Sequence, residues 1–223
     1  MVLRFVFTVV CLIGGLHDVI SRQGCCGPKQ WTGVAIQKLG RYDHDLDVAS
    51  LADISTNVAY DYVAKKISLQ QKIHNITTDN TDLVHVIYDF KQKTEYTITN
   101  GKVCIATPIS GEMWPNCVPE NASHLGTYNI SGPVVDVYRV VTPGGATVRF
   151  SVTYELCYPG TESLLTSGPV YDLTVSVYEN VTKGITDPSV FSVPVFCHHR
   201  QMKTNYTSST ITELIHRSLL SWR

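Results

Sequence analysis

The sequence predicts an all-β protein built from antiparallel strands. In residues 147–156 apolar and polar side chains alternate along the chain. This period of two is typical of a strand with one buried and one solvated face. Turn signals separate the expected strands: Asn100-Gly101 suits the positive φ angles of a type I′ turn, and the Pro-Gly-Gly run in 142–145 marks a second hairpin.

The remaining strands are expected from apolar, β-branched segments bounded by polar turns. They cover residues 31–39, 57–67, 83–90, 95–99, 102–107, 133–141 and 171–178.

Only the C-terminal end has a helical period. Its apolar residues fall on one helix face, and Thr210 and Glu213 have the spacing of a capping box. The apolar positions are Ile211, Leu214, Ile215, Leu219 and Trp222. We expect a short helix that docks on the sheet, with a partner or a membrane surface as the alternative.

Length and composition fit a single folded domain. The chain has 223 residues, of which 43% are hydrophobic, enough for a real core. Lys and Arg number 18 against 19 for Asp and Glu. The apolar content argues against disorder. The near-neutral charge balance argues against nucleic-acid binding, which usually needs a clustered basic face.

The N-terminus has the features of a secretion signal. Arg4 precedes the apolar run 5–13, and Gly14 and Gly15 follow it. The run is too short to span a bilayer. We therefore expect a signal peptide within residues 1–24, cleaved between 15 and 24, and one β domain over 25–223; a buried N-terminal strand is the alternative.

Cysteine usage points to an oxidising compartment. Outside the signal there are six cysteines, an even number that predicts three disulfides in an exported chain. No paired spacing typical of zinc is present, and the run Cys197-His198-His199 has no second cluster to complete it. The six are Cys25, Cys26, Cys104, Cys117, Cys157 and Cys197; their pairing is left open by the residues alone.

Glycosylation sequons are dense and agree with export. Each Asn-x-Ser/Thr would mark an exposed position if glycosylated. They lie at Asn75, Asn121, Asn129, Asn180 and Asn205. The sequence thus predicts a secreted, extracellular glycoprotein, with the lysosome as an alternative destination.

Several motifs in order resemble the ependymin-related family. The opening 25–31 (CCGPKQW) is similar to the family's Cys-x-x-Pro-x-x-Trp stretch, and Cys104 follows a strand pair as the family's internal cysteine does. Further similar segments are 118–121 (VPEN), 128–133 (YNISGP), 156–159 (LCYP) and 184–194 (GITDPSVFSVP), closed by Cys197. Together they cover about residues 25–197.

The resemblance implies a fold and two disulfides. Family members have two stacked, curved antiparallel sheets, similar to bacterial lipoprotein carriers, with an apolar pocket between them. The implied bonds are Cys25–Cys157 and Cys104–Cys197, and elimination then pairs Cys26 with Cys117. The chain lacks the family's further cysteine near the C-terminus.

We expect the pocket to be lined by alternating apolar residues of three strands, with a closed core as the equal alternative. These residues are Val84, Val86, Tyr88, Phe150, Val152, Tyr154, Val175 and Val177.

A weaker candidate site is acidic. Asp43, Asp45 and Asp47 place three carboxylates at alternate positions, and Ca²⁺ prefers several oxygen ligands. The run is no EF-hand, because Val48 and Ile54 occupy the positions of the required Gly and Glu. A solvated turn is the alternative interpretation.

The expected function is binding without catalysis. None of the common catalytic or phosphate-binding motifs is present. We expect a secreted glycoprotein that binds a hydrophobic, lipid-like ligand and needs no cofactor, with Ca²⁺ binding and cell-matrix adhesion as further roles that the resemblance implies. The alternative is a structural extracellular or biomineral (shell) matrix glycoprotein. Collagen-like matrix and a homodimer are candidate partners; nucleic acid and a membrane span are not expected.

The third disulfide has a direct test. Peptide mapping under non-reducing conditions is expected to recover Cys26 joined to Cys117. A peptide joining Cys117 to Cys104 would contradict this pairing.

Overall fold

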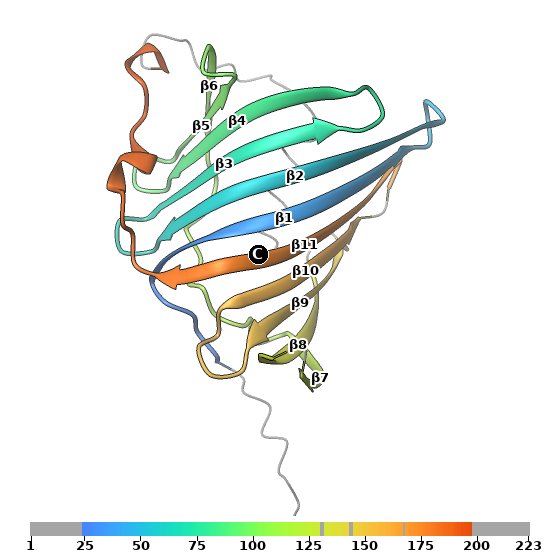
Figure 1. Ribbon diagram of the computed structural model, residues 1–223, viewed down its shortest axis with the longest axis vertical. Coiled ribbons are helices and arrows are strands. Elements are labelled where there is room, and N and C mark those ends of the chain that lie inside the picture. The colour runs from blue at the N-terminus through green and yellow to red at the C-terminus, as the bar shows by residue number, and fades with distance from the viewer. Residues whose placement is uncertain (1–23, 130–131, 143–144, 167, 198–223) are drawn as a thin grey trace, which may run out of the picture.

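The computed structural model describes residues 24–129, 132–142, 145–166 and 168–197. Within them, eleven strands form one antiparallel sheet with the order β6-β5-β4-β3-β2-β1-β11-β10-β9-β8-β7 (Figure 1). The expected signal peptide and the expected helix over 210–222 lie outside the described residues. Near its end the described chain forms two short 3₁₀ turns, η1 (Pro188–Phe191) and η2 (Val195–Cys197).

The strands differ widely in length, and those near the centre of the sheet are the longest. Their bounds are β1 Gln30–Asp43, β2 Val48–Asp61, β3 Lys66–Asn75, β4 Asn80–Asp89, β5 Thr94–Thr99, β6 Val103–Pro108, β7 Ser123–Asn129, β8 Val134–Val141, β9 Thr147–Thr153, β10 Pro159–Thr166 and β11 Val170–Lys183.

The prediction of a curved, all-antiparallel β fold is confirmed, and the structure adds that its two halves are continuous. Strand β1 pairs with β2 on one side and with β11 on the other, over almost its full length. We call the pairing of β1 with β11 the β1–β11 seam. It joins the half β1–β6 to the half β7–β11. The two sheets expected from the sequence are therefore two parts of one sheet (Figure 1).

Two expected strand boundaries are wrong for local reasons. The expected strand 57–67 contains a turn, in which Lys65 has φ 59° and the Asp61 carboxylate accepts a hydrogen bond from the Ala64 N–H. The expected strand 147–156 ends at Thr153, whose carbonyl accepts a hydrogen bond from Cys157 N–H. The Asn100-Gly101 turn has positive φ at both residues, as a type I′ turn requires.

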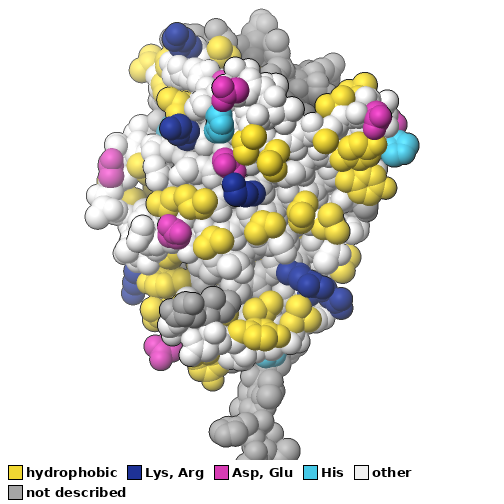
Figure 2. Space-filling model, turned by 45° about the vertical axis from the view of Figure 1, so that its right-hand side comes forward, with side chains coloured by type: hydrophobic (Ala, Val, Ile, Leu, Met, Phe, Trp, Pro, Cys, Tyr) yellow, Lys and Arg dark blue, Asp and Glu magenta, His cyan; other side chains and the backbone are white. Residues whose placement is uncertain are grey.

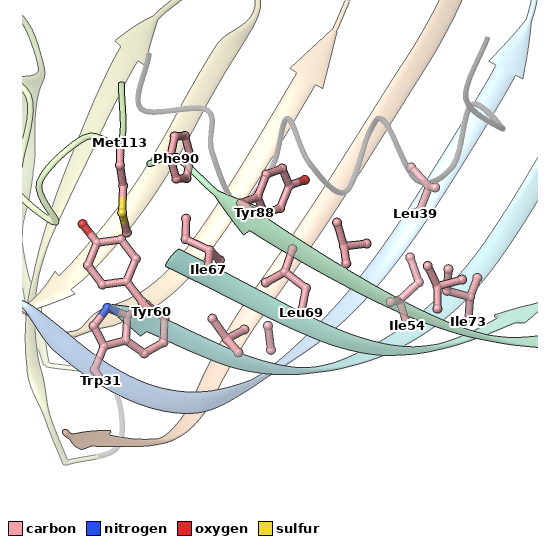
Figure 3. Packing of buried hydrophobic residues seen from close by; sticks show 14 of the residues in the cluster. Trp31, Leu39, Ile54, Tyr60, Ile67, Leu69, Ile73, Tyr88, Phe90 and Met113 are labelled. Carbon is pink, nitrogen blue, oxygen red and sulfur yellow. The ribbon is translucent and has the colours of Figure 1, made fainter. Parts of the chain in front are cut away.

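Side chains alternate between two faces of the sheet. The inner face carries the buried residues Trp31, Ile54, Tyr60 and Leu69, and Figure 3 shows such side chains projecting from one side of β1–β4. They form one cluster on β1–β4, and a second cluster on β8–β10 is centred on Tyr138 and Phe150. Each half of the sheet therefore has its own apolar core.

Polar side chains are buried where the seam crosses the inner face. Gln37 Nε2 donates to Ser176 Oγ at 3.0 Å, and Thr56 Oγ1 donates to Gln37 Oε1 at 3.0 Å. Further along the seam, Arg41 Nε donates to the Asp172 carboxylate at 2.8 Å. These bonds link β2, β1 and β11, and they satisfy polar groups that would be costly to bury alone.

Three disulfides fasten the loops to the sheet. They join Cys25 to Cys157, Cys26 to Cys117 and Cys104 to Cys197, the same pairs that were expected from the sequence. The neighbours Cys25 and Cys26 reach different partners because Cys25 is buried in the β8–β10 core and Cys26 is exposed. The first two bonds hold the segment before β1 against the loops that follow β9 and β6.

The segment 184–197 covers the outer face of β4–β6. Ile87, Tyr96 and Ile98 pack there with Val193 and Cys197. His85 Nε2 lies 2.9 Å from Ser68 Oγ and 3.2 Å from the Val190 carbonyl oxygen, so it connects β3, β4 and η1. Burial lowers the pKa of His85, and the Val190 carbonyl opposes this shift.

This contact predicts acid sensitivity. Since the folded pKa of His85 lies below its usual 6.5, the unfolded chain binds the proton more readily, and stability from this group is lost as pH falls through and below 6.5. His85→Gln keeps an N–H donor without the titration, so its free energy of unfolding in urea should fall less between pH 7.5 and pH 5 than that of the native chain. An equal fall in both proteins would contradict the prediction.

Candidate ligand-binding site

A narrow apolar cavity lies at one end of the inner face. It is formed between the sheet and the loop that connects β6 to β7, and the space inside it that the centre of a water molecule can occupy is about 80 Å³. The lining residues come from five strands and two loop segments: Trp31, Val58, Tyr60, Ile67, Leu69, Phe90, Glu112, Met113, Trp114, Pro115, Asn116, Pro159 and Tyr178.

Aromatic rings form the floor of the cavity. Trp31 stacks on Tyr60 with ring centroids 5.9 Å apart, and Tyr178 meets Trp31 edge-on at 6.3 Å. Figure 3 shows Met113 above Tyr60 and Trp31. Because β1 pairs with β11 at this end, residues 31 and 178 become neighbours despite their separation in sequence.

The loop over the cavity is held at several points. Tyr60 Oη donates to the Trp114 carbonyl at 2.6 Å, and Lys93 Nζ donates to the Gly111 carbonyl at 2.7 Å and to the Glu112 carboxylate. The Cys26–Cys117 bond fixes the end of this loop segment. These contacts hold the cavity wall in place from within the fold.

The cavity interior carries no charged group. Burial raises the pKa of Tyr60, and burial together with the nearby Glu162 carboxylate raises the pKa of Tyr178 well above its usual value. Both phenols therefore stay neutral at physiological pH. The one ionisable carboxyl of the lining, Glu112, is exposed at the rim, where the hydrogen bond from Lys93 lowers its pKa.

Two lining side chains hold buried donors without a partner among the described residues. These donors are Trp31 Nε1 and Asn116 Nδ2. A buried donor left unpaired costs about 1–3 kcal/mol. Asn116 is packed tightly against Gly27: a Cβ at position 27 would lie 2.2 Å from Asn116 Nδ2, so only glycine fits there.

The structure separates the pocket residues expected from the sequence into three groups. Val84, Val86 and Tyr88 are buried in the β1–β4 core, next to the cavity but not among its lining residues. Phe150 and Val152 are buried in the other core, on β9.

The expectation for the remaining three residues is wrong. Val175 and Val177 lie on the outer face of β11 and are 44% and 43% exposed. The reason is that β11 turns its polar residues, such as Thr174 and Ser176, inward to the seam. Tyr154 follows the end of β9 and is 39% exposed.

The residues that line the cavity were missed for a physical reason. Met113, Trp114 and Asn116 belong to a loop, and no periodic pattern predicts which loop residues return to a sheet. The available signals were the bulky aromatics at strand ends, Trp31 and Tyr60, and the Trp-Pro pair between two cysteines.

The acidic run lies in the turn between β1 and β2. The Asp43 carboxylate accepts hydrogen bonds from the Asp45 and Leu46 N–H groups, and Asp47 accepts one from the Tyr42 hydroxyl. In the part of the chain that the structure describes, no group of three or more His, Cys, Asp or Glu side chains is placed to hold a metal ion. The structure therefore adds no support for the calcium hypothesis.

The asparagines of four sequons fall within the described ranges, in strands or in loops. Asn121, Asn129 and Asn180 are exposed, and Asn75 is half-buried at the end of β3. Asn205 lies outside the described residues.

Comparison with known proteins gives the family. A family model described as Ependymin matches residues 78–197, more than half of the chain. The chain belongs to the ependymin family. The mammalian ependymin-related protein 1 of Mus musculus is 24% identical over 204 residues, covering 86% of this chain and 84% of the relative. The ependymin-related protein 1 of Haliotis asinina is 27% identical over 197 residues, covering 81% and 93%.

The solved structures that match this chain have low sequence identity and low TM-scores. A LolA superfamily protein from Nitrosomonas europaea has a TM-score of 0.35 at 8% identity, covering 76% of this ependymin-family chain and 93% of that protein. A DUF1329 family protein from Desulfovibrio piger has a TM-score of 0.29 at 8% identity, with coverages of 74% and 90%. Both scores are low, and the fold rests on the strand pairing described above. No helix of the described residues is long and apolar enough to cross a membrane.

The Tyr60 hydroxyl offers a test of the loop contact. Tyr60→Phe removes the hydrogen bond to the Trp114 carbonyl and is expected to lower the free energy of unfolding by about 1 kcal/mol at pH 7. Because the folded pKa of Tyr60 is raised, its stabilising effect is present below pH 10 and is lost as pH rises above that value.

The variant should therefore lose less stability than the native protein between pH 9 and pH 11 in urea titrations. Tyr128→Phe is the control, since Tyr128 is 51% exposed. Identical pH profiles for all three proteins would contradict the assignment.

Proposed function

We propose that this chain is a secreted, non-catalytic binding protein that takes a slender hydrophobic ligand, such as an acyl chain, into the cavity between the sheet and the β6–β7 loop. The observation that carries the proposal is the cavity itself, with its apolar lining and open mouth. Burying an acyl chain there stabilises the complex by about 0.8 kcal/mol for each CH₂ group.

The rigidity of the cavity supports binding. A preformed site loses little conformational entropy when the ligand enters. The stacked pair Trp31 and Tyr60 and the loop bond from Tyr60 to Trp114 hold the walls in place. The Cys26–Cys117 disulfide prevents the loop from leaving the sheet.

The unpaired donors indicate the polar end of the ligand. A ligand carbonyl or carboxyl oxygen could accept from Trp31 Nε1 or Asn116 Nδ2, which otherwise lack partners among the described residues. Such a bond would recover the cost of burying these donors. We therefore favour a fatty acid or an acyl ester over a plain hydrocarbon.

Export is part of the proposal. Three disulfides are typical of proteins that fold in oxidising compartments. The exposed sequons at Asn121, Asn129 and Asn180 are accessible to the glycosylation machinery. Family membership fits an extracellular protein as well.

A matched pair of substitutions tests the cavity. Leu69→Phe adds bulk to a lining residue, whereas Ile54→Phe adds the same kind of bulk to the same core outside the cavity. Both should destabilise the fold by about 1–3 kcal/mol. Only Leu69→Phe should weaken binding of a fluorescent fatty acid, by about tenfold, the effect of losing two CH₂ contacts.

Binding is followed by fluorescence titration, and folding by thermal melting. Equal affinities in both variants would contradict the cavity assignment. If the native protein neither binds the fatty acid saturably nor releases lipid into organic solvent, the ligand-binding proposal fails and the matrix-glycoprotein alternative is favoured.

A further inference from the structure

A groove on the outer face of β1–β3 extends from β11 to η1. The space in it that the centre of a water molecule can occupy is about 250 Å³. Its strand residues alternate with inner-face residues such as Trp31, Tyr60 and Leu69, so it lies on the opposite face of the sheet from the ligand cavity. We call it the outer groove. It is lined by Thr32, Gly33, Val34, Asn57, Val58, Ala59, Ser68, Gln70, Asn180 and Val190.

Small side chains leave the space that forms the outer groove. Ala59 on β2 is in register with Thr32 on β1 and with Ser68 on β3, so three small residues form one row across the sheet. Val190 of η1 contributes the wall above the sheet. A row of larger side chains would fill this space with protein atoms.

The neighbouring row carries two exposed amide side chains. Asn57 is in register with Gln70 on β3 and with Val34 on β1. Neither amide makes a side-chain hydrogen bond to another described residue. Each offers an acceptor oxygen and two N–H donors to a ligand.

The outer groove is uncharged. None of the described residues that line it is acidic or basic. On the face of the molecule that Figure 2 shows, charged side chains are few and scattered among hydrophobic and uncharged polar ones. A neutral groove with paired amides and one apolar wall suits a neutral sugar, whose hydroxyl and acetamido groups need both donors and acceptors.

A sugar attachment site lies at the edge of this groove. Asn180 lines the groove and begins the sequon in 180–182. The register between β1 and β11 shifts there, so that Asn180 and Val181 stand opposite Gly33 alone, as in a β-bulge. Asn180 has φ 53°, a left-handed conformation that asparagine adopts more readily than most residues, and its side chain is exposed.

We propose that an N-glycan on Asn180 folds back into the outer groove. Its first N-acetylglucosamine residues bind the amides of Asn57 and Gln70, and a C–H face of a sugar ring packs on Val190. Covalent attachment keeps the sugar at a high local concentration, so weak contacts suffice. The inference rests on the export part of the proposed function, because N-glycans are added only in the secretory pathway.

The docked glycan links the sheet to the segment that covers its outer face. Val190 belongs to the segment 184–197, which is also held by the contact of 3.2 Å between its carbonyl oxygen and His85 Nε2. A glycan that touches both β2–β3 and Val190 adds a second attachment. It should therefore reduce local opening of the segment.

Enzymatic release of the glycans tests the docking. The protein is secreted from eukaryotic cells and treated, without denaturation, with peptide N-glycosidase, and release is followed at each site by peptide mass spectrometry. The glycan on Asn180 should be released about tenfold more slowly than that on the exposed Asn129, since hydrogen bonds to the groove withdraw it from the enzyme.

A pair of double variants separates docking from general accessibility. Asn57→Ala/Gln70→Ala removes the two amides and should speed release at Asn180, with no change at Asn129. The matched control, Asn80→Ala/Lys102→Ala, removes two exposed polar side chains outside the groove and should leave both rates as in the native protein. Equal release at position 180 in both variants overturns the proposal.

Hydrogen exchange tests the effect on the covering segment. Asn180→Asp abolishes the sequon and keeps a residue type that tolerates positive φ. Amides in 184–197 should exchange faster in this variant than in the native glycoprotein. Asn129→Asp removes a glycan elsewhere and should leave these amides unchanged. If the segment exchanges equally in all three proteins, the glycan does not hold it and the proposal fails.

This proposal and the proposed function fail in different ways. If Asn180 is unmodified while other sequons carry glycans, export stands and the docked glycan is ruled out. If none of the sequons is glycosylated, the export part of the proposed function fails as well. Fatty-acid binding by Asn180→Asp should equal that of the native protein, because the ligand cavity lies on the inner face.

Discussion

The pairing of β1 with β11 is the constraint on which the rest of the structure depends. It joins the strands that come first and last in the described sequence, and so it makes one sheet from two halves with separate cores. At this seam the inner face buries Gln37, Ser176 and Thr56 in a hydrogen-bonded chain. Because β11 uses its polar residues there, its apolar residues face outward. The pairing of β1 with β11 thus determines which residues of β11 face inward and which face solvent.

The candidate cavity follows from the same seam. Trp31 opens β1 and Tyr178 lies near the end of β11, and antiparallel pairing brings their rings together. Tyr60 completes the aromatic floor from β2 and reaches up to the β6–β7 loop. The loop is closed over this floor by the Cys26–Cys117 bond, which starts in the segment that leads into β1. The site therefore exists only once contacts between distant parts of the sequence have formed.

The sequence predicts turns and strands in this protein better than it predicts which face of a strand is buried. The hairpin at Asn100-Gly101 follows from backbone preferences of two residues, and its positive φ angles agree. The alternation in β11 predicts a strand correctly, but it cannot tell which set of side chains is buried. The usual rule places valines inside, whereas hydrogen bonds across the seam make Thr174 and Ser176 the inner residues. The cavity lining from the loop, such as Met113, has no periodic signal at all.

In the β8–β10 part of the sheet, acidic and basic residues lie on opposite faces. The buried acidic groups of the β8–β11 half have partners within the fold: Asp136 lies 3.3 Å from His124 Nε2, and Asp172 accepts a hydrogen bond from Arg41 Nε. Arg139 and Arg149 have no such partner among the described residues and point to solvent beside apolar side chains. The two arginines are in register and repel each other, since like charges directly opposite across strands are unfavourable. Burial of the acidic groups on the inner face therefore leaves this strand pair with only basic charge on its outer face.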